Sequence, residues 1–397
     1  MVLLSGDTYF KTFYPMSDYI TGEDDEMTEN DTNRAQRIEA DTVKSESGAP
    51  TLEDRSHSSS ERPESAVRSE QMKMAPKLLH KLKQKLALLS DSSGNIPLDE
   101  AVLDALPEGT QAQFAVSYGV SAWSFTAKIT AVDSTGKPTS FFLKYVAGDL
   151  GKPQLEGEFV GMSALYNLAS DFVPKPIAWG KLSDQTLATY FLITEFKHFM
   201  PVLPDAVKLG AKLAAMHLKS AWPNGKFGFH IQTYDGARIQ YVGWEDSWTS
   251  FFSKLLAEAY RQDVETNGIW PELHTAYGRV QSHLLPRLIG ALEADGRKVT
   301  PMLIHGDLWD GNIGVEADTG EPWIFDCAAY YAHNEMELGI WRAERHQMRA
   351  KAYRREYLRH CEPSEPEEEW DDRNLLYSAK TNFMLSAIFP GSPARRS

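Results

Sequence analysis

The order of strand-like and helical patterns divides this chain of 397 residues into two unequal parts. The first part carries two strand-like runs around a turn at Gly119, a third strand, a helix and a fourth strand, at residues 112–132, 140–146, 155–168 and 190–196. Helical spacing dominates after Pro204, over residues 205–220, 245–264, 270–294 and 335–359. A strand-rich segment with one embedded helix, followed by a larger helical segment, predicts an α+β fold with two lobes.

The composition of the chain predicts a separate leader before these two lobes. Residues 1–75 hold 16 acidic and 8 basic side chains, so this stretch accounts for −8 of the formal net charge of −14. A serine-rich, acidic sequence with few apolar residues cannot bury enough surface to offset chain entropy, which predicts a disordered leader. Leucines at helical spacing then indicate a leading helical segment, and the smaller and larger lobes follow it: residues 76–111, 112–197 and 198–397.

The acidic balance and the cysteine count exclude several classes of protein. A broad electrostatic grip on nucleic acid or on an anionic membrane requires clustered Lys and Arg, so neither partner is expected. Cys327 and Cys361 are the only cysteines and lie far apart, which excludes a disulfide scaffold and a structural zinc site. The apolar runs fall short of the ~20 residues of a membrane span. These features predict a cytoplasmic protein, and nothing in them indicates an oligomeric state.

One stretch carries the chemistry: Leu303-Ile-His-Gly-Asp-Leu-Trp-Asp-Gly-Asn-Ile-Gly, followed by Trp323-Ile-Phe-Asp. Asp307 precedes Asn312 by five residues, Asn312 precedes Asp326 by 14, and an apolar run stands before each aspartate. Phosphotransferases share this layout, in which one carboxylate faces a substrate hydroxyl while an amide oxygen and a second carboxylate hold Mg²⁺. We therefore expect Asp307 to be the catalytic base, and Asn312 and Asp326 to be the Mg²⁺ ligands.

Two other kinds of metal site compete with this interpretation. A calcium loop has oxygen ligands at every second position and glycine at the sixth, a register that Asp307, Asp310 and Asn312 do not keep. A His/Asp metallohydrolase needs further histidine ligands, and His333 and His346 lie downstream without matching carboxylate spacing. The phosphotransferase interpretation therefore fits the residues best.

Residues upstream of this stretch favour a nucleotide site. Lys144 ends an apolar strand, and Glu158 lies 14 residues later at the start of the embedded helix, where a Lys–Glu ion pair could clamp phosphates. Gly119 lies in a turn 25 residues before Lys144, where a loop would cover phosphates. Because a single glycine cannot form a glycine-rich cradle, we expect backbone N–H groups and the hydroxyl of Ser117 or Ser121 as donors. An ordinary hairpin is the alternative.

From about residue 98 onward, the chain resembles the fructosamine (ketosamine, ribulosamine) 3-kinase family, a branch of the aminoglycoside-phosphotransferase-like group within the protein-kinase-like fold. The most specific strings are His305-Gly-Asp-Leu-Trp-Asp-Gly-Asn and Ile324-Phe-Asp-Cys-Ala-Ala-Tyr-Tyr-Ala-His-Asn-Glu-Met-Glu. The resemblance implies a phosphotransferase that uses ATP and Mg²⁺ to phosphorylate the 3-hydroxyl of ketosamines. These substrates are fructosyl- or ribulosyl-lysine, free or on protein, and their phosphorylation leads to deglycation.

The resemblance also implies roles for individual residues. Asp307, Asn312 and Asp326 would take the roles of base and metal ligands given above. Trp309 would stack on the ketosamine. The residues that would bind substrate or brace the metal-binding loop are His333 and Glu335. The expected adenine-binding hinge follows the fourth strand and uses the backbone groups of Glu195, Phe196 and Lys197.

Two other functions remain open at this point. A kinase for another hydroxylated amine, such as an aminoglycoside or choline, would share the motifs, but Trp309 and the Tyr330-Tyr-Ala-His segment disfavour it. A catalytically silent scaffold would bind a basic partner through the acidic leader, but the complete set of motif residues disfavours that function too. The chain ends in Phe389-Pro-Gly-Ser-Pro-Ala-Arg-Arg-Ser, where a closing helix of the family is expected, and this suggests a truncated C-terminus.

Overall fold

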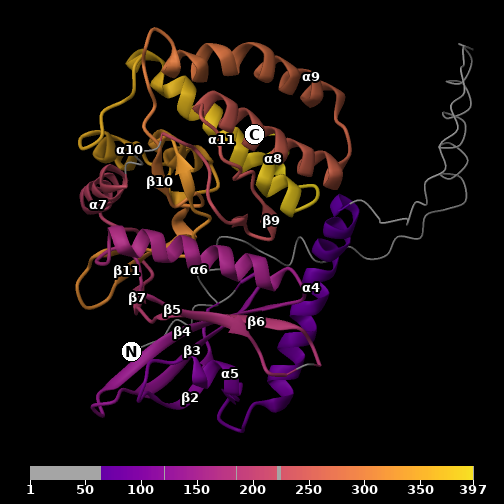
Figure 1. Cartoon of the computed structure of the whole chain (residues 1–397), viewed down its shortest axis with the longest axis vertical. Helices are drawn as coiled ribbons and strands as arrows, with labels where there is room; N and C mark the ends of the chain where they lie inside the picture. The colour runs from indigo at the N-terminus through magenta and orange to yellow at the C-terminus, as the bar shows by residue number, and fades with distance from the viewer. Residues whose placement is uncertain (1–63, 120, 185, 221–224, 397) are drawn as a thin grey trace, which may run out of the picture. The chain divides into compact units, whose positions relative to one another are not determined.

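The computed structural model describes residues 64–119, 121–184, 186–220 and 225–396 (Figure 1). Contacts within the chain separate two units, Met1–Ser69 and Glu70–Ser397, and the described sheets lie in the second. The first helix among the described residues begins at Glu64, so residues 64–75 are helical, whereas the sequence predicted disorder for them. The rest of the expected leader lies outside the described residues.

Helices and strands follow one another in the predicted order. The strand-rich part contains α4 (Glu64–Leu89), β1 (Asn95–Ile96), α5 (Glu100–Asp104), β2 (Gln111–Ser117), β3 (Phe125–Val132), β4 (Pro138–Ala147), α6 (Gly151–Leu168), β5 (Pro176–Lys181), β6 (Thr189–Glu195) and β7 (Phe199–Met200). The helical part contains, with η for 3₁₀ or π turns, α7 (Ala206–Lys219), β8 (Tyr234–Asp235), β9 (Arg238–Ile239), α8 (Trp248–Asn267), α9 (Pro271–Arg279), η1 (Val280–Ile289), η2 (Gly290–Glu293), β10 (Met302–Ile304), η3 (Asp310–Asn312), β11 (Ile313–Glu316), β12 (Pro322–Ile324), β13 (Tyr330–Ala332), η4 (Asn334–Arg342), η5 (Gln347–Arg349), α10 (Lys351–Leu358), η6 (Glu367–Glu369), α11 (Trp370–Ile388) and η7 (Pro393–Arg395).

A six-stranded antiparallel sheet forms the smaller lobe, in the order β1-β2-β3-β4-β6-β5. Successive side chains of β4 point to opposite faces of the sheet, as in any strand. Leu143 and Tyr145 join one core with leucines of α4, whereas Val146 joins the core on the face that α6 covers. Lys144 belongs to this second face, and the alternation of β4 therefore directs it toward α6.

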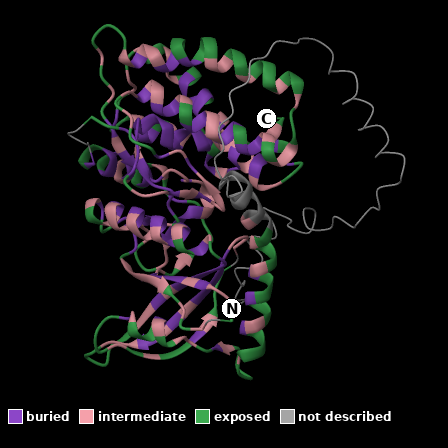
Figure 2. Ribbon diagram, turned by 45° about the vertical axis from the view of Figure 1, so that its right-hand side comes forward, coloured by how far each residue is buried: buried purple, intermediate pink, exposed green. Residues whose placement is uncertain are grey.

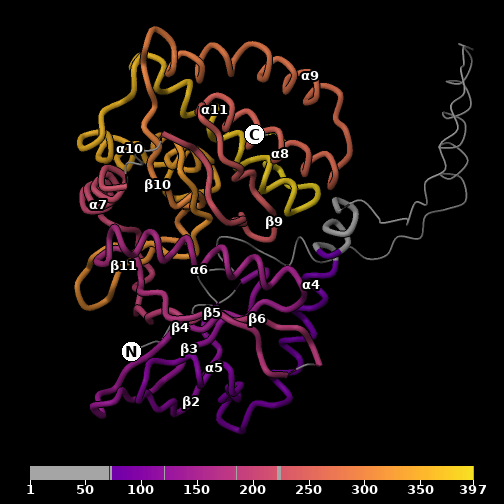
Figure 3. The backbone as a smooth tube through the Cα atoms, viewed as in Figure 1, coloured from indigo at the N-terminus to yellow at the C-terminus, as the bar shows by residue number. Residues whose placement is uncertain are grey.

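The larger lobe is built around the helices α8 and α11, which pack together (Figure 1), and buried residues gather in the interior of this lobe (Figure 2). Trp248 and Trp341 are fully buried in its core. Two small sheets, β10–β13 and β12–β11–β7, carry the loops of the chemistry-bearing stretch, and Figure 3 shows β10 between α6 and the helices α8 and α11, with β11 beside α6. Within the described residues, no helix is long and apolar enough to cross a membrane.

Two parts of the fold differ from the sequence-based expectation. The stretch at 335–359, expected as one helix, is divided into η4, η5 and α10. Every residue from Asn334 to Trp341 is buried, so packing from all sides sets the path of η4 and no exposed helical face exists there. Strand β5 went unrecognised because Pro176 begins it and its side chains are only half-buried, which leaves no clear alternation of apolar residues.

Candidate active site

The loop after β10 is fixed by its backbone. Gly306 adopts φ +82°, and a Cβ at this position would lie 2.3 Å from the carbonyl oxygen of Ala328. Only glycine fits there. The Glu337 carboxylate accepts hydrogen bonds from the N–H groups of His305 (2.5 Å) and Gly306 (3.0 Å), so both of its oxygens hold the loop. Asp307 is therefore presented on a rigid turn.

Asp307 and Asn312 lie side by side at the end of this loop. The Asn312 amide Nδ2 donates to the backbone oxygen of Asp307 (2.8 Å) and to its carboxylate Oδ2 (3.1 Å). Burial, followed by the nearby carboxylates of Asp235 and Asp326, raises the pKa of Asp307 well above its ordinary value. The charge of Lys380 opposes that rise. A buried carboxylate of this kind is a stronger proton acceptor than one in water.

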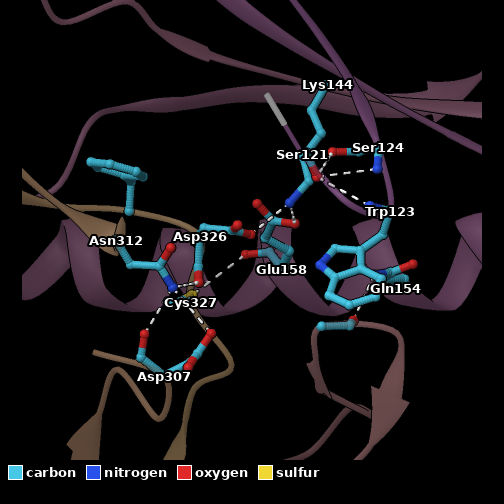
Figure 4. Close-up of polar contacts among 12 residues, drawn as sticks. Ser121, Trp123, Ser124, Lys144, Gln154, Glu158, Asp307, Asn312, Asp326 and Cys327 are labelled. Carbon is cyan, nitrogen blue, oxygen red and sulfur yellow. Dashed lines mark hydrogen bonds and ion pairs between the residues drawn. The ribbon is translucent and has the colours of Figure 1, made fainter. Parts of the chain in front are cut away.

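Lys144, Glu158 and Asp326 form one ion-pair cluster, in which Lys144 and Glu158 are buried and half of the Asp326 side chain is exposed (Figure 4). Lys144 Nζ lies 2.7 Å from Glu158 Oε2 and 2.6 Å from Asp326 Oδ1. The expected Lys–Glu pair is thus present, and the carboxylate expected to bind metal is within reach of the same lysine. Asp326 has φ +60°, a left-handed conformation that is unusual for a residue other than glycine and that turns its side chain toward Lys144.

Charges within the cluster depend on one another. Burial raises the pKa of Glu158 to about 8, with Lys144 opposing and Asp326 adding to the shift. Burial acts in the same direction on Asp326, but the Lys144 ammonium outweighs it and lowers the pKa of Asp326. Burial also disfavours the ammonium of Lys144, and the two carboxylates overcome this effect and raise its pKa. The lysine therefore stays charged at the centre of the site.

Asn312 and Asp326 suit a magnesium ion. Asn312 Nδ2 also donates to the backbone oxygen of Asp326 (3.3 Å), which places the two residues in contact. The amide oxygen of Asn312 and the half-exposed carboxylate of Asp326 are both hard oxygen donors. No cluster of three or more His, Cys, Asp or Glu side chains suited to a metal occurs among the described residues. Two protein ligands are typical of Mg²⁺, which keeps waters and phosphate oxygens as its other ligands.

The loop between β2 and β3 carries the residues expected to face phosphates. Gly119 has φ +78°, and a Cβ there would meet only the Thr126 hydroxyl at 3.6 Å, so conformation and not crowding favours glycine. Ser121 Oγ accepts from the N–H groups of Trp123 (3.3 Å) and Ser124 (3.2 Å) and from the Ser124 hydroxyl (2.8 Å). This hydroxyl braces its own loop, and its role toward phosphates stays a prediction.

Residues of the expected hinge lie directly after β6. Lys197 Nζ pairs with Glu195 Oε1 (2.8 Å) and lies 3.9 Å from the ring centre of Trp323, so its side chain is directed away from the backbone edge. The ring of Phe196 contacts that of Tyr118 edge-on at 5.0 Å. Among the described residues, the Lys197 N–H has no backbone partner. A free donor at this edge fits the expected recognition of adenine, which stays a prediction.

Trp309 lies two residues beyond Asp307, as expected from the sequence. Its indole covers Gly311, where a Cβ would lie 2.2 Å from the ring, and its ring centre is 5.6 Å from that of His346. The side chain is half-buried. An apolar ring face beside the expected base suits a sugar ring, and this substrate role stays a prediction.

His333 and Glu335 do not form part of the site, which corrects the prediction that they bind substrate. His333 is 1% exposed and uses both ring nitrogens, with Tyr377 Oη and Ser364 Oγ each at 2.9 Å. Glu335 is fully buried and pairs with Arg373 (3.1 Å). Both side chains connect η4 and the residue before it to the segment that precedes α11. The loop after β10 is braced by Glu337 and not by His333 or Glu335.

Sequence reasoning missed three residues near the site: Glu337, Asp235 and Lys380. The quoted string ends at Glu337, but no spacing rule connects it to the loop N–H groups that it holds. Asp235 and Lys380 form an ion pair of 2.7 Å between β8 and α11, which lie far apart in the sequence. The sequence shows Lys380 only as a lysine within a helical segment. That this lysine is buried becomes apparent only in the folded lobe.

Cys327 follows Asp326 and lies close to Glu158 (Figure 4). Its Sγ is 3.9 Å from the backbone oxygen of Glu158. Burial and the nearby Glu158 carboxylate raise the pKa of the thiol well above its ordinary value. A buried thiol with a raised pKa is a poor nucleophile, so Cys327 contributes packing and not chemistry.

Comparisons with known proteins show which family this chain is similar to. A sequence model described as fructosamine kinase matches residues 124–392. The chloroplastic protein-ribulosamine 3-kinase of Oryza sativa subsp. indica is 32% identical over 282 residues, which cover 67% of this chain and 76% of the rice protein. The ketosamine-3-kinase of Mus musculus is 29% identical over 221 residues, which cover 50% of this chain and 68% of the mouse protein.

The fold is also that of a solved relative. A crystal structure from Haemophilus somnus 129PT, of a candidate fructosamine-3-kinase, matches with a TM-score of 0.56 at 16% identity and covers 72% of this chain and 88% of that one. At this identity the likeness concerns the fold, and it confirms the predicted α+β, bilobal, protein-kinase-like architecture. Because the family model matches most of the chain and the rice enzyme is similar over three quarters of its own length, the chain belongs to the fructosamine kinase family.

Proposed function

We propose that this protein is a ketosamine 3-kinase, which transfers the γ-phosphoryl group of ATP to the 3-hydroxyl of a ketosamine. The observation that carries the proposal is the assembly of Lys144, Glu158, Asp326, Asn312 and Asp307 into one contiguous polar site. Family membership and relatives named for ribulosamine and ketosamine support this substrate class.

Phosphoryl transfer assigns a task to each of these side chains. The substrate oxygen O3 forms a bond to the γ-phosphorus while the bond from that phosphorus to the β,γ-bridging oxygen breaks, and ADP leaves. Asp307 receives the proton of the 3-hydroxyl. Its raised pKa suits that role, although alignment of the reacting atoms matters more than base strength in this chemistry.

Nucleotide binding would use the smaller lobe. Lys144 would contact the α- and β-phosphates, with Glu158 holding it in place, and the backbone of residues 195–197 would recognise adenine. Asn312 and Asp326 would hold Mg²⁺, which when bound neutralises charge on the phosphate oxygens. Gly119 and Ser121 lie in the loop that would cover the phosphates.

Trp309 is proposed as the sugar-binding residue beside the base. Its half-buried ring and its position two residues after Asp307 support this role. His333 and Glu335 have no part in it, because both are buried in the larger lobe. A glycated lysine, free or on a protein, is the proposed substrate.

The test is a substrate comparison with product analysis. Purified protein, ATP and Mg²⁺ are incubated separately with fructosyl-lysine, ribulosyl-lysine, choline and an aminoglycoside, and ³¹P NMR identifies the product. We expect ATP-dependent formation of a sugar 3-phosphate from at least one ketosamine and none from choline or the aminoglycoside. Phosphorylation of choline or the aminoglycoside alone would establish the alternative small-molecule kinase in its place.

A further inference from the structure

An ion pair that none of these roles uses lies beside the site. Asp235 ends β8 in the two-stranded hairpin β8–β9, and Lys380 lies in the middle of α11. Lys380 Nζ is 2.7 Å from Asp235 Oδ2. The side chain of Lys380 is 1% exposed and that of Asp235 is 12% exposed, so Asp235 is the more accessible partner of this ion pair.

The hairpin adjoins the loop that carries Asp307. Gln240, which follows β9, donates from Nε2 to the carbonyl oxygen of Ala328 (3.0 Å). The same oxygen is the atom that excludes a side chain at Gly306, directly before Asp307. On its other side, the hairpin accepts a hydrogen bond at Gly236 O from Gln154 of α6 (2.7 Å), as Figure 4 shows. Asp235 therefore sits on an element held between α6 and the catalytic loop.

Electrostatics agree with this placement. The charges of Asp235 and Lys380 both act on Asp307, which requires that the three groups lie within range of one another. The hydroxyl of Tyr330 is buried, has no hydrogen-bond partner in the described part of the chain, and feels the charges of Asp235 and Asp307. Hydrogen-bonding capacity thus remains unfilled beside these two carboxylates.

The Asp235 carboxylate can accept further hydrogen bonds. The Lys380 ammonium contacts Oδ2, and within the described residues Oδ1 accepts no hydrogen bond. An ionised carboxylate can accept several hydrogen bonds, and a partly buried one is stabilised by a further donor, above all a charged one. A donor from outside the chain would complete this carboxylate.

The chemistry of the substrate supplies such a donor. A ketosamine carries a secondary amine on C1, which is protonated near neutral pH, and only C1, C2 and C3 separate its nitrogen from O3. A group that binds this nitrogen must therefore lie close to the group that receives the O3 proton. We propose that Asp235 binds the protonated amine of the ketosamine through Oδ1 and that Lys380 is a positioning residue that holds Asp235 in place.

This inference rests on the proposed function and adds to it the recognition of the amine. It explains how a kinase of this family could distinguish a ketosamine from an ordinary ketose, since a ketose lacks the positive charge that Asp235 accepts. A charge-assisted hydrogen bond of this kind corresponds to about a 10- to 100-fold effect on kcat/KM.

The test compares two substrates that differ at one atom. Fructosyl-lysine is compared with an analogue in which an ether oxygen replaces the amine nitrogen, in the wild type, in Asp235→Asn and in the exposed control Asp246→Asn. We expect Asp235→Asn to lower kcat/KM for fructosyl-lysine about 10- to 100-fold, mostly through KM, and to leave the ether analogue within about threefold. The control should behave as the wild type, because the side chain of Asp246 is 85% exposed and its ion pair is with the surface residue Lys226.

A second variant separates binding from folding, because Asp235→Asn leaves Lys380 buried without its partner. Asp235→Asn combined with Lys380→Met removes both charges, and we expect it to fold and still to lack the preference for the amine. Recovery of that preference in the double variant, or equal losses on both substrates in Asp235→Asn, would overturn the inference while the proposed function stands. If the wild type phosphorylates neither fructosyl-lysine nor ribulosyl-lysine, the proposed function is wrong and the inference falls with it.

Discussion

Lys144 contacts two carboxylates at once, and this sharing explains much of the site. The carboxylates of Glu158 and Asp326 would repel each other, and the single ammonium of Lys144, which contacts both, offsets that repulsion. Half of the Asp326 side chain is exposed, whereas Glu158 is buried. Asp326 is thus the partner that can turn to a metal ion, while Glu158 keeps the lysine in place.

A substitution at Glu335 tests whether this residue stabilises the fold or binds the substrate. We expect Glu335→Gln to lower the free energy of unfolding by about 3 kcal/mol or more, because it leaves the buried Arg373 without its charge partner. KM for the ketosamine should not change. Urea denaturation and steady-state kinetics measure the two effects, and Glu344→Gln at an exposed position is the matched control. A large rise in KM at unchanged stability would return Glu335 to the substrate site.

The spacing of Asp307, Asn312 and Asp326 predicted their proximity, because loops after neighbouring strands bring such residues together. His333 and Glu335 were misplaced for the opposite reason. Nothing in the sequence shows that Arg373, which is almost 40 residues away, returns to pair with Glu335. The spacing of residues within a motif predicts which side chains of one loop lie close together. Pairs between residues far apart in the sequence, such as Glu335 and Arg373, are known only from the folded structure.

At the scale of elements, the approach of α6 to the larger lobe depends on a glycine. A Cβ at Gly157 would lie 2.2 Å from the carbonyl oxygen of Gln232, just before the β8–β9 hairpin. Glu158 is the next residue along the helix, so any displacement of α6 moves the partner of Lys144. Close helix packing and the geometry of the ion-pair cluster are therefore linked.

Gly157→Ala should accordingly damage both stability and activity. We expect a loss of about 1–3 kcal/mol from overpacking, together with a fall in kcat, since α6 must shift away from the hairpin. Gly278→Ala is the matched control, because α9 leaves open space there, and replacing an exposed helical glycine stabilises by about 0.5–1 kcal/mol. Thermal unfolding and turnover assays check both variants. Equal behaviour of the two alanine variants would show that the contact is unimportant.

The start of α8 depends on the carboxylate of Glu293. It accepts hydrogen bonds from the N–H groups of Trp248 (2.8 Å) and Thr249 (3.0 Å) and from the Thr249 hydroxyl (2.7 Å). Burial opposes the charge, but these hydrogen bonds outweigh it and lower the pKa of Glu293 below its ordinary 4.5. The carboxylate therefore stabilises the folded state fully above pH 4.5, and this contribution is lost as the pH falls through the lowered pKa.

Glu293→Gln should consequently destabilise the protein by about 1 kcal/mol at pH 7, as the loss of a helix cap does. The difference between variant and wild type should shrink as the pH approaches 4 and below, because the wild type then loses its charge as well. Urea denaturation at several pH values measures this difference. A difference that stays constant with pH would mean that the charge of Glu293 plays no part.

Strands β2, β3, β4 and β6 and the helices α6, α7 and α8 lie where alternation and helical spacing predicted them. Strand β5 escaped prediction because its proline and half-buried side chains give no alternation. The division of residues 335–359 also escaped, since Gly339 packs so closely on Tyr377 that a Cβ would lie 2.8 Å from it. The spacing of apolar residues predicts a helix or strand when one face is buried and the other is exposed. It fails where a segment is buried on all sides, as in η4, or is half-buried throughout, as in β5.

At the scale of the whole molecule, the smaller lobe depends on a helix outside its sheet. Leu79, Leu82 and Leu86 of α4 are at most 7% exposed and share a core with β3 and β4. Each buried leucine contributes about 1.5–3 kcal/mol. The sequence predicted a leading helical segment but did not indicate that it completes this core.

Two truncations separate the leader from this helix. Removal of residues 1–75 should leave the melting temperature and kcat/KM nearly unchanged, because it spares all three core leucines. Removal of residues 1–89 should lower the melting temperature by more than about 8 °C, as the lost burial corresponds to several kcal/mol. Calorimetry and kinetics distinguish these outcomes. A large loss of kcat/KM in the shorter truncation would show that the leader contributes to the site.

Asp307 is proposed to accept the proton of a ketosamine hydroxyl during phosphoryl transfer from ATP. The most direct test measures turnover of fructosyl- or ribulosyl-lysine by the wild type and by Asp307→Asn, together with ATP affinity and thermal stability. We expect kcat to fall by about 10³-fold or more while ATP binding and folding are kept. Equal turnover by the two proteins would contradict the claim.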